Sequence, residues 1–405
     1  MRPLLLVTTT FFPHAGVGSV RASNWARMMP GLGWKPTIAC RWYGGTATRA
    51  LLDEHVSPAC DVVYLDGPWA GLTQAQRDEA AQRRGDRGVE IKHNGAVPRG
   101  ALVTLAKRAV GRSAMARVAF VPDAAVAFWR SRVGRIGRVG QECGAEALVT
   151  SSPPHSVHVV GLDPRRAAIP WLADFRDPMV MDSRYGPFGA AAVRTRAYRA
   201  FEAACLEAAD AVTLLNAMHA RWMHRRFPLQ RDRLRLLEPM CPEDLVAGRV
   251  VGEPTGGGRL GVRVVGSVGN EEAVRLALAV RSLVDREASP LDIELRFVGI
   301  PPATRDQIES TLADRVVFTG NLRHDEAKRQ IVGADLLVTS LSPHRARSHG
   351  TSTKLYEFVA ARRPVVHINP MAPDRHAMRG LVRAGALRIL DRPADGELRE
   401  ALAAG

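Results

Sequence analysis

Short apolar runs alternate with longer helical stretches along the whole chain. Runs of roughly four to eight apolar residues with helices between them are typical of βαβ units, which form a mainly parallel sheet. In the first half of the chain the pattern predicts strands at residues 4–8, 37–41, 61–65, 147–151, 171–175 and 211–215. It predicts helices between them at residues 19–32, 124–133, 155–162 and 193–208.

A second series of the same kind begins after a cluster of Pro and Gly at residues 239–258. It predicts strands at residues 262–266, 293–298, 316–318, 336–339 and 365–368, and helices at residues 271–284, 303–312, 325–332 and 352–361. A Pro- and Gly-rich segment between two such series is typical of a linker. We therefore predict an α/β protein of two Rossmann-like domains facing a central cleft, with residues 1–240 in the first domain, residues 241–258 as the linker and residues 259–405 in the second domain.

One stretch breaks the pattern. Residues 70–98, rich in Gln, Arg, Asp and Gly, show no apolar periodicity, and we predict a mobile loop there. The length of 405 residues otherwise suits two domains, since a domain usually has about 100 to 200 residues. A content of 46% hydrophobic and 24% charged residues is that of a folded globular protein.

The sequence also bears on the compartment. No apolar run approaches the ~20 residues that a membrane helix needs, and the N-terminal apolar run is too short for a secretory leader. The five cysteines are scattered and none lies in a Cys-x-x-Cys pair, which argues against a disulfide framework and a zinc knuckle. We predict a protein of the reducing cytoplasm, soluble or peripheral on the inner face of the membrane.

The formal net charge of +15 lies almost wholly in the first half of the chain. Residues 1–240 hold 33 Lys and Arg against 20 Asp and Glu, whereas residues 241–405 hold 23 against 21. Residues 99–138 carry nine basic residues and one acid, Asp123. This segment predicts an anionic partner such as a membrane surface, although a solvated helix face explains it equally well. Nucleic acid is disfavoured because the segment offers few aromatic side chains for stacking.

The first motif is a glycine-containing turn between the strand at 4–8 and the helix that follows. Gly16, Gly18 and Ser19 would let the backbone and the helix N-terminus approach an anion such as a diphosphate. A glycine that merely bends the turn is the alternative. The turn lacks the full Gly-x-Gly-x-x-Gly pattern and no acid follows the strand at 37–41, so NAD binding is disfavoured.

The next two motifs also follow strands. Residues 150–156 read Thr-Ser-Ser-Pro-Pro-His-Ser, in which the prolines and serines suit a helix start and His155 is placed to contact a ligand. The strand at 171–175 runs into Asp174, Arg176 and Asp177, which are costly to bury unless they are paired or lie at the mouth of a site. A buried ion pair is the alternative, but a transferase needs both an acid–base group and a cation for a leaving diphosphate.

The fourth motif is a polar loop in the second domain that leads into a helix. Gly350, Thr351 and Ser352 would point N–H groups and hydroxyls at an anion, with Lys354 in the first helical turn beside it. Glu357 follows on the same face. A surface helix with an internal Lys–Glu pair is the alternative.

Together, in this order, the four motifs resemble the family 4 retaining glycosyltransferases of the GT-B fold. The Ser-Ser-Pro-Pro loop and the Asp-Phe-Arg-Asp-Pro strand end are similar to a bacterial subgroup of that family, and the most specific segments are residues 170–178 and 354–366. The resemblance covers nearly the whole chain. It differs at residue 349, where many members have Glu and this chain has His349, and at residues 266–270, where many members have an Arg.

The resemblance implies a role for each motif. Glu357 would bind the ribose of a nucleotide-sugar, with Lys354, Ser267 and residues 350–352 near its diphosphate. Gly16, Gly18 and Ser19 of the acceptor-binding first domain would close on the same phosphates. The residues expected near the reacting sugar are His155, Asp174, Arg176 and Asp177.

The resemblance further implies a glycosyltransferase with a nucleotide-diphosphate sugar as donor and no metal or other cofactor. The acceptor would be a lipid-linked intermediate, a polysaccharide or a small molecule. Two alternatives stay open: a GT-B sugar-nucleotide epimerase, and a catalytically silent GT-B scaffold that binds anions.

Overall fold

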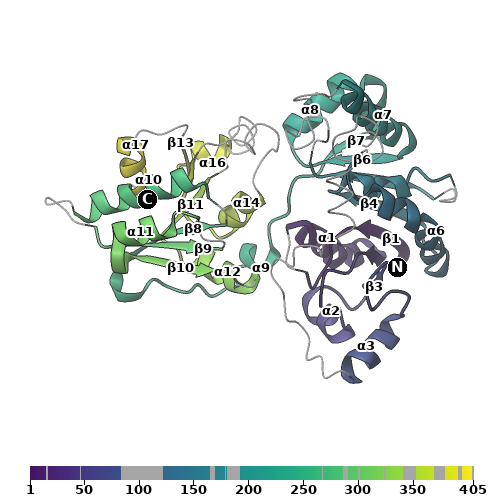
Figure 1. The fold of residues 1–405 in the computed structure, drawn as a ribbon, viewed down its shortest axis with the longest axis horizontal. Coiled ribbons are helices and arrows are strands. Elements are labelled where there is room, and N and C mark those ends of the chain that lie inside the picture. The colour runs from purple at the N-terminus through teal and green to yellow at the C-terminus, as the bar shows by residue number, and fades with distance from the viewer. Residues whose placement is uncertain are drawn as a thin grey trace, which may run out of the picture. The chain divides into compact units, whose positions relative to one another are not determined.

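The computed structural model describes the chain except for a set of short segments and three longer ones. The segments outside the description are residues 15–16, 46, 84–121, 165–168, 178, 180–191, 267, 286–290, 300–301, 321, 323, 341–352, 369–378, 391–394 and 404–405. The chain divides into two compact units, Met1–Glu238 and Pro239–Gly405. Each unit is a parallel sheet covered by helices (Figure 1).

The first unit contains a seven-stranded sheet in the order β3-β2-β1-β4-β5-β6-β7. Its strands are β1 (Arg2–Thr8), β2 (Trp34–Cys40), β3 (Asp61–Tyr64), β4 (Ala147–Ser152), β5 (Trp171–Phe175), β6 (Ala211–Leu214) and β7 (Leu234–Leu236). All six neighbouring pairs are parallel. The six predicted strands are all present, and the short edge strand β7 is additional.

Helices and 3-10 turns connect these strands. They are α1 (Val17–Met28), η1 (Met29–Leu32), α2 (Arg49–His55), α3 (Gln74–Arg83), α6 (Val126–Glu142), η2 (His155–Val160), α7 (Ala192–Ala208), α8 (Ala217–Arg226) and η3 (Pro228–Arg233). The mobile loop predicted for residues 70–98 is wrong in part, because α3 lies inside it. This helix is mostly polar and gave no apolar period, but buried Arg77 fixes it by donating hydrogen bonds to the carbonyl oxygens of Leu72 and Val62.

The second unit contains a six-stranded parallel sheet in the order β10-β9-β8-β11-β12-β13. Its strands are β8 (Leu260–Val265), β9 (Ile293–Val298), β10 (Val316–Gly320), β11 (Leu336–Ser340), β12 (Val365–Ile368) and β13 (Leu387–Leu390). Its helices and turns are α9 (Glu243–Val246), η4 (Gly256–Gly258), α10 (Asn270–Val284), α11 (Arg305–Leu312), η5 (Ala313–Arg315), α12 (His324–Val332), α14 (Thr353–Ala360), α16 (Arg379–Arg383) and α17 (Asp395–Ala403).

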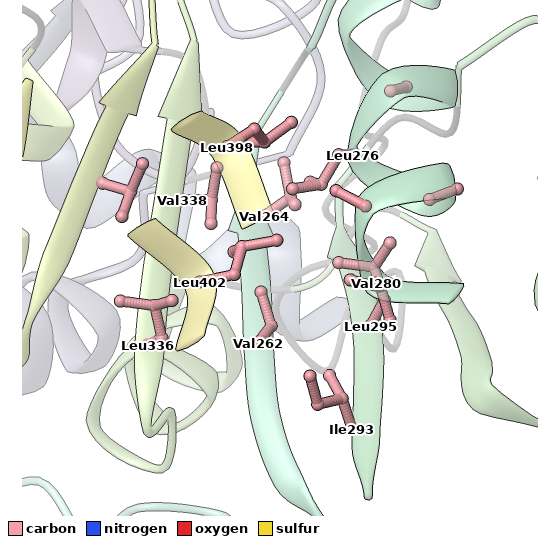
Figure 2. Close-up of a cluster of buried hydrophobic side chains, with 14 of the residues drawn as sticks. Val262, Val264, Leu276, Val280, Ile293, Leu295, Leu336, Val338, Leu398 and Leu402 are labelled. Carbon is pink, nitrogen blue, oxygen red and sulfur yellow. The ribbon is translucent and has the colours of Figure 1, made fainter. Parts of the chain in front are cut away.

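A dry aliphatic core lies on one face of this second sheet. Figure 2 shows side chains of β8, β9 and β11 packed against α10 and α17. The strand residues Val262 and Val264 are two apart and so share a face, while Leu276 and Val280 are four apart on one side of α10. Because helices cover both faces of a parallel sheet, its strands are apolar almost throughout, which is why the apolar runs located them.

Residues 241–258, predicted as a linker, pack on the second unit. Arg263 of β8 is fully buried and donates hydrogen bonds to the carbonyl oxygens of Glu253 and Gln330. The Lys328 ammonium of α12 pairs with Asp244 of α9 at 2.5 Å. Because the buried Arg263 guanidinium takes one of its acceptors, the Glu253 carbonyl oxygen, from the segment after Pro239, that segment is held to the sheet.

Among the described residues, no helix is both long enough and apolar enough to cross a membrane.

Candidate functional site

Three of the four predicted motifs meet at one edge of the first sheet. Strands β1, β4 and β5 are neighbours and parallel, so their carboxyl ends lie together. Thr8 is in register with Ser151, and Ser152 is in register with Phe175. Ligands of open α/β sheets bind beyond these ends. The glycine turn, the Ser-Ser-Pro-Pro loop and the Asp-Phe-Arg-Asp strand end are therefore neighbours in space.

Asp174 is the centre of a buried hydrogen-bond network. Its carboxylate accepts bonds from Arg21 Nη2 at 2.8 Å and Nε at 3.1 Å, from Ser151 Oγ at 2.7 Å and from Thr213 Oγ1 at 2.7 Å. Burial alone would raise the pKa of Asp174, but the Arg21 charge and these bonds bring its pKa below the ordinary value. Four donor groups already bond to the Asp174 carboxylate. Asp174 thus joins α1, β4, β5 and β6 below the carboxyl ends of β1, β4 and β5, where the three motifs lie and which we call the motif edge.

Arg176 binds backbone carbonyl oxygens of the two neighbouring motifs. Its guanidinium donates to the oxygens of Ser152, Gly18 (2.9 Å) and Pro153 (3.3 Å). The side chain is 7% exposed, and burial lowers its pKa while Asp174 and Asp177 oppose that shift. Arg176 thus ties the glycine turn to the proline loop.

The glycine turn is closely packed at Gly18, where a larger residue would not fit. A Cβ at Gly18 would lie 2.7 Å from Thr10 Oγ1 and 3.5 Å from the Arg176 guanidinium. Ser19 is buried, and its hydroxyl donates to the carbonyl oxygen of His14 inside the turn. Gly18 and Ser19 are therefore packed against other groups of the protein. Gly16 lies outside the described residues.

His155 is fully buried behind the motif edge. Its ring stacks on Phe175 with centroids 5.8 Å apart. Asp177, by contrast, is half-buried and is the outermost described member of the Asp-Phe-Arg-Asp motif. The four residues predicted as catalytic thus lie in one region, with Asp177 the most accessible of them.

Sequence reasoning missed two polar residues of this region. Arg21, the ion-pair partner of Asp174, lies on α1 just after the glycine turn, and its signal is a cation in the first half of a helix that must pack against a sheet. His219, in the first turn of α8, is 1% exposed, and both of its ring nitrogens lack a hydrogen-bond partner. No motif marks His219, because its burial depends on how α8 packs.

In the second unit, Lys354 of α14 crosses the end of β8. Its Nζ donates to the carbonyl oxygen of Val265 at 3.0 Å. Gly266 follows with a φ of 95°, and a Cβ there would lie only 1.6 Å from Nζ. Only glycine leaves room for the lysine at this position, so the chain places an ammonium group at the carboxyl end of β8.

Glu357 lies one helical turn after Lys354. The side chain is half-buried, and burial raises its pKa against the opposing charges of Lys354 and Lys328. Cys241 Sγ donates to the carbonyl oxygen of Tyr356 at 3.3 Å, which holds the residues before α9 next to α14. Lys354 and Glu357 therefore lie on the same helix, one turn apart.

Three neighbouring strands of this sheet end in glycines with positive φ. These are Gly266, Gly299 and Gly320, with φ of 95°, 124° and 67°. The Gly266 N–H donates to Val298 O at 2.7 Å, and the Gly299 N–H donates to Gly320 O at 3.0 Å. Without Cβ atoms, the backbone at these ends can be approached closely by a flat ligand group. No sequence motif marks these three glycines.

The remaining donor-site predictions fall outside the described residues. They are Ser267, Gly350, Thr351 and Ser352, together with His349. Within the described part of the chain, no group of three or more His, Cys, Asp and Glu side chains is placed to hold a metal ion. The metal and cofactor predictions stay predictions.

Comparison with known proteins now bears on this second unit. Residues 260–391, about a third of the chain, match the family model described as glycosyl transferases group 1. Over these residues the C-terminal unit resembles a group 1 glycosyltransferase domain. The predictions of a family 4-like protein, of the α/β fold class and of an enzyme are confirmed. No curated protein matches the chain.

Solved structures share the fold of this glycosyltransferase. A glycosyltransferase from Rickettsia africae is 10% identical with a TM-score of 0.55, over 100% of this chain and 87% of that one. WaaG, a glycosyltransferase involved in lipopolysaccharide biosynthesis, is 14% identical with a TM-score of 0.53, over 98% and 89%. A putative UDP-N-acetylglucosamine 2-epimerase from Listeria monocytogenes is 11% identical with a TM-score of 0.54, over 99% and 87%.

Proposed function

We propose that the enzyme transfers a sugar from a nucleotide-diphosphate sugar bound by its C-terminal unit, with retention of configuration and without a metal ion. Lys354 carries the proposal. Its ammonium lies at the carboxyl end of β8, where open α/β sheets bind ligands, within the unit that matches the glycosyltransferase family. There it would bind the diphosphate and stabilise its charge as it leaves.

Two further features support a nucleotide at this place. The glycine row at the ends of β8, β9 and β10 offers backbone that a flat base or ribose could approach. Glu357, with its raised pKa, is suited to a hydrogen bond with a neutral hydroxyl such as those of ribose. The named ligand of one fold relative, a UDP-GlcNAc 2-epimerase from Neisseria meningitidis bound to UDP-GlcNAc, belongs to the same chemical class.

In the N-terminal unit we propose that Asp177 lies nearest the reacting sugar, while the buried side chains of His155, Asp174 and Arg176 position it. The hydrogen bonds and the burial favour this division, because Asp174 and Arg176 are buried and bonded to protein groups whereas Asp177 is half-buried. Gly16, Gly18 and Ser19 would form the turn that closes on the donor phosphates. The acceptor is a lipid-linked intermediate, a polysaccharide or a small molecule of the cytoplasm.

The test is a thermal-shift screen of nucleotide-diphosphate sugars with the unmodified enzyme and with Lys354→Ala. A true donor at 100 times its Kd stabilises the fold by about 2.7 kcal/mol. The variant should lose this stabilisation and sugar transfer while it keeps its own unfolding midpoint. Lys35→Ala, which removes an exposed ammonium paired with Asp61, is the matched control and should keep both. Unchanged turnover in Lys354→Ala would contradict the proposal.

A sugar-nucleotide epimerase is the second candidate, because epimerases share this fold at similar TM-scores. The group 1 family match favours transfer over epimerisation. The two reactions differ in stoichiometry: an epimerase converts its nucleotide-sugar with no acceptor present, and a transferase releases nucleoside diphosphate only as the acceptor is glycosylated. Conversion of the donor into an isomer without acceptor would select the epimerase.

A membrane contact through residues 99–138 remains part of the proposal, and its described portion is on α6. Arg135 there is occupied, because its guanidinium donates to the carbonyl oxygens of Tyr64 (3.0 Å) and Leu65 (3.3 Å). Arg130 and Arg138 are exposed. Of the described part of this segment, these two cations are the ones best placed to meet an anionic surface.

A further inference from the structure

A denser cluster of cations lies elsewhere in the N-terminal unit. Residues 221–235 contain six arginines and one acid, Asp232, and span α8, η3 and the start of β7. These three elements contact one another at the β7 edge of the sheet (Figure 1). Arg221, Arg225, Arg231 and Arg235 are exposed, and Arg221 and Arg225 are four residues apart, on one side of α8.

The exposed arginines have few partners within the protein. Among the described residues, no ion pair involves any arginine of residues 221–235. Arg233 is the structural member, because its Nη1 donates to the carbonyl oxygens of Glu207 (2.6 Å) and Ala209 (3.2 Å) at the end of α7. The cluster thus presents several uncompensated charges to solvent.

An exposed leucine lies between these arginines in the sequence. Leu229, the second residue of η3, is 92% exposed, more than any other large apolar side chain of the described residues. The aromatic rings of Trp222 and Phe227 in the same segment are half-buried, and the Arg226 guanidinium lies 5.4 Å and 5.6 Å from their centroids. An exposed apolar side chain in a segment rich in exposed arginines is typical of an interfacial membrane anchor.

We propose that Arg221, Arg225, Leu229, Arg231 and Arg235, here called the α8–η3 surface, bind the surface of an anionic lipid bilayer, with Leu229 entering the headgroup region. Nucleic acid has the same charge but is the poorer match. Its binding sites combine cations with exposed aromatic rings on which bases stack, and the exposed apolar group here is an aliphatic leucine.

The position of the surface keeps it clear of the motif edge of the same unit. Helix α8 follows β6 and begins at the carboxyl edge of the sheet, with Asn216 as its N-cap. It runs back along the sheet, so its last turn and η3 lie at the amino edge, where β7 begins. Binding at this edge leaves the carboxyl ends of β1, β4 and β5 open. The inference does not depend on the donor proposed above.

Flotation of the full-length protein with lipid vesicles tests the proposal. The vesicles contain phosphatidylcholine alone or phosphatidylcholine with phosphatidylglycerol, at low and at high salt. We expect binding to the anionic vesicles only, and release at high salt, because exposed charges are screened beyond about 10 Å at 0.1 M. The variant R225E/R231E should lower the partition coefficient at least about tenfold, since each basic residue near an anionic surface contributes roughly a fivefold factor.

Two further variants separate this surface from the other candidates. Leu229→Gln keeps the charges and should weaken binding several-fold at every salt concentration, because it removes an apolar insertion. R130E/R138E makes the same charge change on α6 and should weaken binding less than R225E/R231E does. All variants should keep the unmodified far-UV circular dichroism and unfolding midpoint, since the substituted side chains are exposed.

Three results would overturn the proposal. The first is absence of binding to anionic vesicles at low salt. The second is full binding by R225E/R231E, or loss of binding by R130E/R138E alone, which would assign the membrane contact to α6. The third is displacement of the protein from vesicles by a single-stranded oligonucleotide at equal charge concentration, which would identify the surface as a nucleic-acid site.

Discussion

Single charged residues at the carboxyl edge of the first sheet have contrasting roles. Asp174 is fully buried and paired with Arg21, whereas Asp177, three residues later, is half-buried. The sequence alone predicted one catalytic group of charges here. A buried ion pair is costly to form and costlier to break, so Asp174 serves first to hold the strands and α1 together.

Asp174→Asn should strongly destabilise the N-terminal unit. The substitution leaves the Arg21 guanidinium, 8% exposed in the native protein, buried without its counter-charge, and we expect a loss of about 3–5 kcal/mol in the free energy of unfolding. Glu146→Gln, which breaks the exposed pair with Arg2, is the control and should cost less than about 1 kcal/mol. All seven tryptophans lie at or before Trp222, so tryptophan fluorescence in a urea titration reports this unit. Equal effects of the two variants would contradict the assignment.

At the proposed donor site, the absence of a side chain matters as much as the side chains that are present. Strand β8 ends in Gly266, whose missing side chain leaves the space that Lys354 of α14 occupies. Residues 266 and 354 are far apart in the sequence, so neither the glycine nor the lysine predicts the other. The local pattern located β8 and α14 separately, and the packing of α14 on the sheet then joined them.

Gly266→Ala should therefore abolish donor binding through displacement of Lys354. The added Cβ would lie 1.6 Å from Nζ, so the ammonium must leave the end of β8. Gly385→Ala is the matched control, because Gly385 lies outside the glycine row and also has a positive φ, 73°, but an added Cβ there meets nothing within 4 Å. Both variants should lose about 1 kcal/mol of stability from backbone strain. The donor-induced thermal shift should disappear in Gly266→Ala alone, and its survival there would refute the link between glycine and lysine.

At the scale of the whole molecule, the two units have separate cores, and the N-terminal unit buries a group of histidines. The N-terminal unit contains the buried histidines His155, His158 and His219 behind its motif edge. Burial lowers the pKa of His219 to about 3 and that of His158 well below its ordinary value. Both rings are thus neutral in the folded protein at neutral pH, whereas in the unfolded chain they take up protons below about pH 6.5.

The N-terminal unit should consequently lose stability in mild acid. Because the folded pKa values lie below the unfolded ones, the unfolded state binds more protons as the pH falls from about 6.5 toward 3, and each histidine contributes up to about 1.4 kcal/mol of lost stability per pH unit. Urea titrations followed by tryptophan fluorescence at several pH values measure the slope. His219→Leu should flatten it, because the leucine cannot take up a proton in the unfolded chain. An unaltered slope in His219→Leu would show that His219 is not responsible.

The sequence by itself determined the elements and the fold class. Strands covered on both faces must be apolar almost throughout, so β1, β4, β5 and β8 were visible as apolar runs, and the motifs after them were found because ligands bind where such strands end. The polar helix α3 was not visible, since its place is fixed by buried Arg77 and not by an apolar stripe. Helix α8 was also missed, because it is mostly polar and its buried side, with His219 and Met223, is narrow.

Only the tertiary structure decided what each polar residue does. Whether Asp174 meets a ligand or a buried arginine depends on α1, which lies more than a hundred residues earlier in the sequence. Whether Lys354 reaches the end of β8 depends on a glycine in another strand. Hydrophobic periodicity is a local property that a sequence carries directly, whereas hydrogen bonding and burial depend on contacts between segments that are distant in the chain.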